Sequence, residues 1–440
     1  MPAKGPDIAG KRLGKADYAS NFADLHPPLT GHEALVESDR CLFCYEAPCQ
    51  TACPTSIDIP LFIREIAAGH PLSAAKTIFD QNILGGMCAR VCPTETLCEE
   101  ACVRMASEGK PVKIGQLQRY ATDSAMADKK HPYARAVPSG KRVAVMGAGP
   151  AGLACAHRLS QHGHQVTIFE ARKKSGGLNE FGIAAYKTVD GFAQQEVDFV
   201  LAIGGIEIEH GRKPKLTELQ KSFDAVFVGV GLAGVNELGI KNDDTKGIAD
   251  AVDYIANLRQ AKDLSKLPVG RKVLVIGGGM TAIDCAVQSK LLGAEDVTIL
   301  YRRGAAHMKA SAFEQNLAQT RGVKIKHWVA PKKILLKSGK VAGLKCEYMV
   351  MKKGRLAGSG ETFDIEADMI FKAIGQTYID VTSDALKLAG GRIAVDQEKR
   401  TSIPGIWAGG DCAAGGKDLT VAAVDDGRRA AESINAYLSA

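Results

Sequence analysis

The chain has 440 residues, which is enough for two to four domains with buried cores. Apolar residues make up 45% and charged residues 24% of it, as in an ordinary soluble globular protein. The net charge of +7 comes from interspersed residues of both signs, and no basic block predicts a nucleic-acid partner. The longest apolar stretch, residues 225–235, is too short and too rich in glycine to cross a membrane. We therefore expect a cytoplasmic protein that binds neither nucleic acid nor membrane.

Residues 1–140 show no strand-like alternation of polar and apolar side chains. Residues 59–68 and 72–81 carry apolar side chains at helical spacing, which predicts short helices. A connector that contains proline and glycine, residues 131–140, ends this region. We expect an α-helical domain over residues 1–140.

Eight of the twelve cysteines lie in two runs inside this region. The first run is Cys41-x2-Cys44-x4-Cys49-x3-Cys53-Pro54, and the second is Cys88-x3-Cys92-Pro93-x5-Cys98-x3-Cys102. Eight thiolates at such spacings fit two 4Fe–4S clusters, which pass single electrons. Structural zinc sites usually pair two short knuckles across a longer gap, and disulfides require export, for which residues 1–6 offer no apolar signal. Clusters are favoured over both alternatives.

A strand–turn–helix unit appears twice, starting its glycine turns at Gly147 and Gly277, 130 residues apart. In the first copy, the strand 141–146 runs into Gly147-Ala148-Gly149-Pro150-Ala151-Gly152 and then a helix over 153–162. Gly147 permits the tight turn, Gly149 lets the backbone approach a pyrophosphate at the positive helix end, and Gly152 lets helix and strand pack closely. A second strand, 165–169, closes with Glu170, where a carboxylate can accept hydrogen bonds from an adenosine ribose. The alternative is a plain glycine turn with a surface glutamate.

The second copy runs from the strand 272–276 into Gly277-Gly278-Gly279-Met280-Thr281-Ala282 and a helix that reaches residue 292. Its second strand, 297–301, ends in Arg302-Arg303 with no acidic residue, and Lys309 follows. A carboxylate there would repel a 2′-phosphate, whereas guanidinium groups can bind one. This favours NADP over NAD, with NADH still possible; the alternative is that these are solvated surface cations.

Near the C-terminus, the strand 406–408 leads through Gly409 to Gly410-Asp411, and a helix follows over 419–437. This segment resembles the element of two-dinucleotide flavoproteins whose aspartate holds the flavin ribityl chain, with the helix start near Thr420 beside the flavin ring. We therefore expect an α/β fold with two nested Rossmann-like dinucleotide-binding domains, preceded by the α-helical iron–sulfur domain. The FAD domain would be discontinuous, residues 141–250 and 395–440, with an NAD(P)H domain inserted over 251–394.

The order of these motifs over residues 30–440 resembles the small subunit of glutamate synthase and the N-terminal half of dihydropyrimidine dehydrogenase. The resemblance implies a first cluster on Cys41, Cys44, Cys49 and Cys102. It implies a second cluster on Cys53, Cys92, Cys98 and Gln118, where glutamate synthase small subunits look more like glutamate. An ordinary polar helix residue is the alternative for Gln118, and Cys88 is left without a role.

The resemblance also implies further cofactor contacts, at Gly177, Leu178, Lys187 (as a cation) and Gly229 beside the flavin, and at Ala373 and Gly375 near the nicotinamide. Two departures concern the substrate side of these sites. The usual Gly-Ile-Pro is Gly182-Ile183-Ala184 here, and the usual Met-Pro is Met308-Lys309.

The resemblance implies that NAD(P)H reduces FAD and that single electrons leave through two clusters, so that no acid–base pair is required. We expect the electron-input subunit of a two-subunit dihydropyrimidine dehydrogenase, whose FMN- and iron–sulfur-containing partner reduces uracil or thymine. One rival is the glutamate synthase small subunit, which would feed a large amidotransferase. A rival of another class is a non-enzymatic iron–sulfur redox sensor or scaffold, against which the intact glycines and Glu170 argue.

Overall fold

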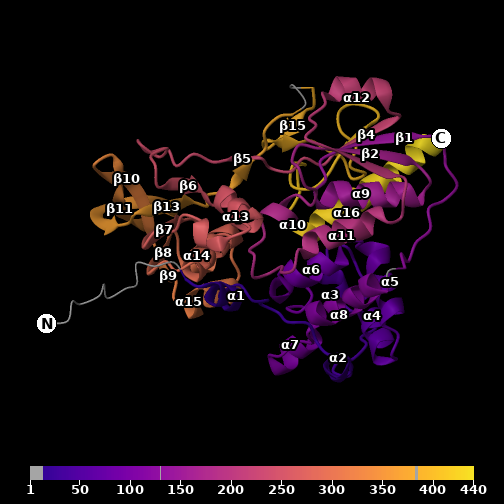
Figure 1. The fold of residues 1–440 in the computed structure, drawn as a ribbon, viewed down its shortest axis with the longest axis horizontal. Coiled ribbons are helices and arrows are strands. Elements are labelled where there is room, and N and C mark those ends of the chain that lie inside the picture. Colours follow the sequence, from indigo (N-terminus) through magenta and orange to yellow (C-terminus); the bar gives the residue numbers. More distant parts are fainter. Residues whose placement is uncertain (1–12, 129, 382–384) are drawn as a thin grey trace. The chain divides into compact units, whose positions relative to one another are not determined.

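A computed structural model describes residues 13–128, 130–381 and 385–440 of the chain (Figure 1). These residues form two compact units. Within its described residues, the first unit contains residues 13–25, 181–189 and 235–376, and the second contains residues 26–180, 190–234 and 377–440. No helix in the described ranges is both long and apolar enough to cross a membrane.

The N-terminal part of the second unit is helical, as expected. Its helices are α2 (Gly31–Ser38), α3 (Pro48–Ala52), α4 (Ile59–Ala67), α5 (Pro71–Gln81), α6 (Gly85–Val91), α7 (Val103–Glu108) and α8 (Ile114–Ala127), with the 3-10 turn η1 (Thr94–Thr96). Helix α4 buries Ile59, Phe62, Ile63 and Ile66, which lie three or four residues apart on one face. Thr30 caps α2 through a capping box with Glu33. Both helices that the apolar spacing predicted, over 59–68 and 72–81, are confirmed.

The second unit continues in a five-stranded parallel sheet with the order β17-β4-β1-β2-β3. Its strands are β1 (Arg142–Met146), β2 (Gln165–Glu170), β3 (Ile206–His210), β4 (Ala225–Val228) and β17 (Ile406–Ala408). The helices of this part are α9 (Pro150–Gln161), α10 (Leu178–Phe181), α11 (Phe192–Leu201), α12 (Leu216–Ser222) and α16 (Thr420–Ser439). Strand β4 is buried along its whole length, which suits its continuous apolar sequence. Because β17 pairs with β4, segments far apart in sequence build one sheet.

The first unit contains a second five-stranded parallel sheet with the order β6-β13-β7-β8-β9. Its strands are β6 (Ile248–Asp250), β7 (Lys272–Ile276), β8 (Asp296–Tyr301), β9 (Lys324–His327) and β13 (Met369–Lys372). The helices are α1 (Lys15–Asn21), α13 (Ala251–Gln260), α14 (Met280–Leu291) and α15 (Ala312–Thr320), with the 3-10 turns η2 (Leu264–Lys266) and η3 (Ala305–His307). An antiparallel sheet, β10 (Val329–Lys337), β11 (Lys340–Lys352) and β12 (Arg355–Glu366), lies between β9 and β13 in the chain. Short strands complete the chain: β5 (Gly234–Val235), β14 (Gln376–Thr377), β15 (Leu388–Ala389) and β16 (Arg392–Ile393).

The unit boundaries differ from those expected from the sequence. The inserted unit spans residues 235–376 rather than 251–394. The reason at its start is that β6 pairs in parallel with β13, so these hydrogen bonds tie residues 248–250 to the second sheet. Residues 13–25, expected in the iron–sulfur domain, also belong to the first unit, where the Asn21 side chain donates a hydrogen bond to the Leu291 carbonyl (2.9 Å). The parallel sheets and the helical N-terminal part confirm the expected fold class.

Candidate functional site

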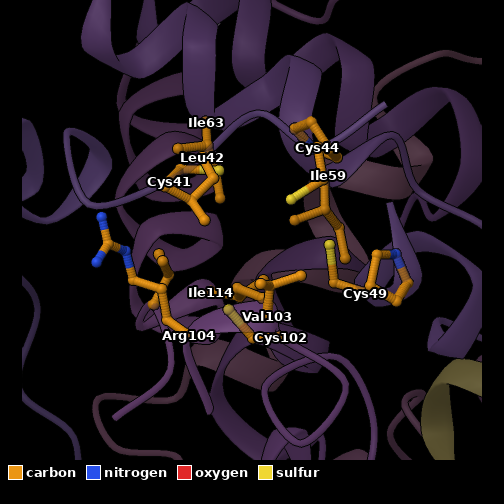
Figure 2. Close-up of a pocket in the computed structure, with 13 residues that line it drawn as sticks. Cys41, Leu42, Cys44, Cys49, Ile59, Ile63, Cys102, Val103, Arg104 and Ile114 are labelled. Atoms are coloured by element: carbon orange, nitrogen blue, oxygen red, sulfur yellow. The ribbon is translucent and has the colours of Figure 1, made fainter. Parts of the chain in front are cut away.

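Four cysteines from both runs line one pocket in the helical part of the second unit. Cys41 and Cys44 lie in the loop after α2, Cys49 lies on α3, and Cys102 caps the N-terminus of α7. In Figure 2 these side chains surround the same space, together with Leu42, Ile59, Ile63, Val103, Arg104 and Ile114. The set is the one that the resemblance implies for the first cluster. The fold therefore brings together ligands that are 61 positions apart in sequence (102 − 41).

The electrostatics of this pocket require a positive partner for the thiolates. Burial raises the pKa of the Cys41 thiol, and the charges of Cys44 and Cys102 raise it further. Burial raises the pKa of Cys49 to about 12, with Cys41 as the next cause. Only the thiolate binds metal, so the group that occupies the pocket must supply the charge that ionises these thiols. Cluster iron would do so.

The remaining cysteines of the runs gather around the C-terminal end of α6. Cys92 is the C-cap of α6, Cys53 is the C-cap of α3, and Cys98 follows η1. Burial raises the pKa of both Cys92 and Cys98, and the charge of Cys53 raises each further. Cys88 is also buried, with a pKa raised mainly by burial. Sequence reasoning left Cys88 aside, but it lies close enough to Cys92 to interact with it electrostatically.

Gln118, the implied eighth ligand, lies on α8 and is buried. Its Nε2 donates a hydrogen bond of 2.7 Å to the carbonyl of Gly85 at the start of α6. The donor end of the amide is therefore held by the backbone, which leaves the amide oxygen as the atom that could bind iron. Its role as a ligand stays a prediction.

The alternatives of disulfides and zinc are tested by the cysteine geometry. All twelve cysteines are free thiols, so the disulfide alternative is wrong. Among the described residues, no three His, Cys, Asp or Glu side chains lie close enough to hold one metal ion. The zinc alternative therefore gains no support from the described residues, and the cluster assignment depends on the cysteine runs and the pocket that four of them share.

In the second unit, the first glycine turn lies at the carboxyl edge of the parallel sheet, where α/β proteins bind ligands. A Cβ atom at Gly152 would lie 1.9 Å from the Gly147 carbonyl oxygen, so only glycine allows this helix to start so close to the strand. A Cβ atom at Gly177 would lie 2.8 Å from the Cα of Gly149, so two bare backbones meet beside the N-terminus of α9. This leaves room for a pyrophosphate at a positive helix end.

Glu170 is buried at the end of β2, and both of its carboxylate oxygens accept backbone hydrogen bonds. Oε2 accepts from the N–H of Ala148, inside the glycine turn, and Oε1 from the N–H of Arg172, each at 2.8 Å. The carboxylate therefore fixes the shape of the turn. Its remaining lone pairs could accept ribose hydroxyls, and this role stays a prediction. The alternative of a surface glutamate is wrong, because Glu170 is only 8% exposed.

The C-terminal segment reaches the same edge of the sheet. Gly410 follows β17, and its N–H donates to Asp426 Oδ2 (3.0 Å). Burial raises the pKa of the neighbouring Asp411. Thr420, the first residue of α16, donates from Oγ1 to the amide oxygen of Asn179 (2.8 Å), a residue that sequence reasoning missed. The structure thus gathers around this edge Gly147, Gly149, Gly152, Glu170, Gly177, Leu178, Gly229, Gly410, Asp411 and Thr420.

The second glycine turn lies at the carboxyl edge of the sheet in the first unit. A Cβ atom at Gly277 (φ +146°) would lie 2.2 Å from the carbonyl oxygen of Ala373. Gly279 is the N-cap of α14, so Met280 and Thr281 form its first turn. The carbonyl of Gly278 accepts a hydrogen bond from the Ala310 N–H (3.1 Å), which holds the loop after β8 beside the turn. Gly375 follows β13 at the same edge, where the Asn236 side chain donates to the Ile374 carbonyl (3.1 Å).

The three predicted phosphate-binding cations lie in the loop after β8. Arg302, Arg303 and Lys309 are all exposed, and in the described part of the chain none of them forms an ion pair. The Arg303 carbonyl accepts a hydrogen bond from the Trp328 N–H (3.2 Å), which fixes the backbone of this loop. The cations are therefore available to bind a 2′-phosphate. Their exposure is equally that of ordinary surface cations, so their role stays a prediction.

Lys187, the expected flavin-side cation, is buried in the first unit. Its ammonium forms ion pairs with Asp284 on α14 (2.8 Å) and Glu314 on α15 (2.6 Å). These carboxylates raise the pKa of Lys187 although burial opposes them. The ion pairs give the lysine a structural role within this unit. A contact with flavin stays a prediction.

Two glycine turns on parallel sheets and a cysteine-lined helical part define an oxidoreductase that combines two dinucleotide sites with iron–sulfur chemistry. The family model described as dihydropyrimidine dehydrogenase domain II, 4Fe-4S cluster, matches residues 18–130. The model described as pyridine nucleotide-disulphide oxidoreductase matches residues 141–427. The chain belongs to the pyridine nucleotide-disulphide oxidoreductase family and carries this 4Fe-4S domain at its N-terminus. It is an NAD(P)H-dependent flavoprotein oxidoreductase.

Two curated relatives span nearly the whole chain. The glutamate synthase [NADPH] small chain of Escherichia coli (strain K12) is 34% identical, over 95% of this chain and 94% of its own length. The NAD-dependent dihydropyrimidine dehydrogenase subunit PreT of Salmonella typhimurium is 35% identical, over 95% of this chain and 98% of its own length. Among solved structures, the T. acidophilum thioredoxin reductase is similar with a TM-score of 0.55 and 23% identity, over 68% of this chain and all of that one. That likeness concerns the fold alone.

Proposed function

We propose that this chain is the electron-input subunit of a dihydropyrimidine dehydrogenase. In this proposal it takes electrons from NAD(P)H in the first unit and passes them, through FAD and two 4Fe–4S clusters in the second unit, to an FMN- and iron–sulfur-containing subunit that reduces uracil or thymine. FAD, when bound, turns a two-electron input into single electrons that clusters can carry. The residues of the chain bind and orient these groups.

One observation carries the proposal: the eight implied ligands fall into two sets with different surroundings. Cys41, Cys44, Cys49 and Cys102 line one pocket. The second set includes Cys92 at the end of α6. Helix α6 packs against α11 and α16, two helices of the α/β part of the second unit (Figure 1). One set near the helices that cover the sheet and another in a separate pocket are what a route from a flavin to a partner requires.

Residues of the two dinucleotide sites would position their cofactors. The first turn of α9 would hold the FAD pyrophosphate, Glu170 its ribose, and Asp411 its ribityl chain. In the first unit, the first turn of α14 would hold the nicotinamide dinucleotide, with Arg302 and Arg303 on a 2′-phosphate. The relatives divide on the coenzyme, since one is named NADPH-dependent and another NAD-dependent.

The proposal is tested on anaerobically purified holoprotein. We expect NAD(P)H to bleach the flavin absorption band and to support reduction of an artificial dye, while uracil is left unchanged. Adding the pyrimidine-reducing subunit should start uracil turnover. Turnover of uracil by this chain alone would contradict the division of labour.

A glutamate synthase small chain is the second candidate, because the relative of that name matches this chain about equally well. Gln118 favours the dihydropyrimidine dehydrogenase subunit. The chain that co-purifies from the native source separates the two: a large amidotransferase would support the second candidate. If NAD(P)H bleached no flavin band, the sensor or scaffold alternative would be favoured instead.

A further inference from the structure

One carboxylate is buried between α11 and α6, the helix that ends at a cluster cysteine. Glu196 lies on α11 and is 1% exposed. Its Oε1 accepts a hydrogen bond of 2.8 Å from the Met87 N–H, in the first turn of α6. Helix α6 ends at its C-cap, Cys92. Glu196 therefore holds the helix whose C-cap is Cys92, one of the second set of cysteines.

The charged groups around Glu196 come from α6 and α8. Arg90 on α6 lies with its guanidinium 3.4 Å from the centre of the Phe192 ring and donates to the Gly86 carbonyl (3.0 Å). It also pairs with Asp123 on α8 (2.9 Å). Arg119 pairs with the same carboxylate (3.3 Å). Cys88 also interacts electrostatically with Glu196.

This environment leaves the Glu196 carboxyl poised between its two forms. Burial raises its pKa to about 8, although the Met87 N–H and the charge of Arg90 lower it. Near pH 8, where the two forms are balanced, a small change in local potential can therefore add or remove its proton. One additional negative charge close by favours the protonated form.

We propose that Glu196 takes up a proton when an electron reaches the metal centre held by Cys53, Cys92 and Cys98. This inference rests on the proposed function. The electron comes from reduced flavin, and the proton comes from water and forms one O–H bond on the carboxylate. The proton returns to water when the electron leaves. Glu196 is thus a positioning residue that links the potential of this centre to pH and keeps the buried charge constant.

The test is a potentiometric titration of anaerobic holoprotein with dithionite and mediators, followed by electron paramagnetic resonance from pH 6 to pH 9.5. In the wild type we expect the potential of one cluster to become more negative as the pH rises through the carboxyl pKa, while the other stays level. Glu196→Gln keeps an acceptor for the Met87 N–H and removes the charge. In this variant we expect the reduction potential of the same cluster to be independent of pH and equal to the low-pH value of the wild type.

Glu432→Gln is the matched control, because Glu432 lies on α16 and pairs with His162 rather than with α6. This variant should keep the pH dependence of the wild type. An unchanged pH slope in Glu196→Gln, or no slope in the wild type, would overturn the inference. Reduced-minus-oxidised infrared spectra of the wild type provide a second measurement, in which a protonated carboxyl band must appear on reduction. Iron and sulfide content and bleaching by NAD(P)H, measured on the same preparation, test the proposed function separately.

Discussion

The ammonium of Lys187 lies 2.6 Å from the Glu314 carboxylate, and both side chains are only 9% exposed. Asp284 provides a second carboxylate at 2.8 Å and also accepts a hydrogen bond from the Tyr186 hydroxyl (3.2 Å). The segment 181–189 is thereby attached to α14 and α15 of the first unit. A buried ion pair of this kind is tolerated only while both signs are present, because removing one partner leaves a buried charge without compensation.

Lys187→Met should destabilise the first unit by about 3–5 kcal/mol, because it leaves two buried carboxylates without a cation. Thermal unfolding checks the change. Adding Asp284→Asn and Glu314→Gln to the lysine variant removes those charges and should restore much of the stability. If Lys187→Met left stability unchanged and altered only the flavin spectrum, the flavin-side role would be favoured over the structural one.

The two cysteine sets should lose iron independently. Cys49→Ser should remove the first cluster and Cys98→Ser the second, each lowering iron and acid-labile sulfide to about half of the wild-type content. Cys346→Ser is the control, because Cys346 is a buried thiol on β11 of the first unit and belongs to neither set. Loss of all iron from either single variant would show that the sets are not separate.

Gln118→Leu should perturb the second cluster alone, because leucine offers no oxygen for iron and no donor for the Gly85 carbonyl. The matched control is Gln116→Leu on the same helix, whose side chain donates instead to the Pro27 carbonyl (3.1 Å). Electron paramagnetic resonance of the reduced proteins is the measurement. Identical spectra for wild type and Gln118→Leu would make Gln118 an ordinary helix residue.

Arg302→Ala should weaken the use of NADPH by about tenfold in kcat/KM, or about 1.4 kcal/mol, with NADH little affected. The reason is that a 2′-phosphate would lose one charged donor. Lys333→Ala, an exposed cation on β10, serves as the control. Unchanged discrimination between the two coenzymes would leave these cations as solvated surface residues.

His157 should make the second unit sensitive to acid. It is 2% exposed, and burial lowers its pKa from 6.5 to about 3. The folded protein therefore disfavours the proton that the unfolded chain binds, so this contribution to stability is present above pH 6.5 and is lost as the pH falls toward 3. The expected slope is about 1.4 kcal/mol per pH unit. The thermal unfolding midpoints of wild type and His157→Phe, measured between pH 5 and 7.5, should converge as the pH falls, because only the wild type loses this contribution.

Local patterns predicted much of this fold. The strands before each glycine turn, the helices after them and the helices over 59–68 and 72–81 depend on neighbouring residues, so sequence periodicity was sufficient. The unit that contains β6 starts before the boundary expected at residue 251, because β6 owes its place to hydrogen bonds with β13, about 120 positions away in the chain. No local signal marks such a pairing. Asn179 was missed for the same reason, since its partner Thr420 lies 241 positions further on.

Sequence by itself determined which residue types are available: thiols at cluster spacing, glycines where a backbone must come close, and Glu170 at the end of β2. These follow from steric and chemical requirements that act within a few residues. Only the tertiary structure decided that Lys187 pairs with two carboxylates, that Cys88 lies near Cys92, and that Glu196 lies buried against α6. Burial and the pairing of charges depend on atoms that packing brings together from distant parts of the chain.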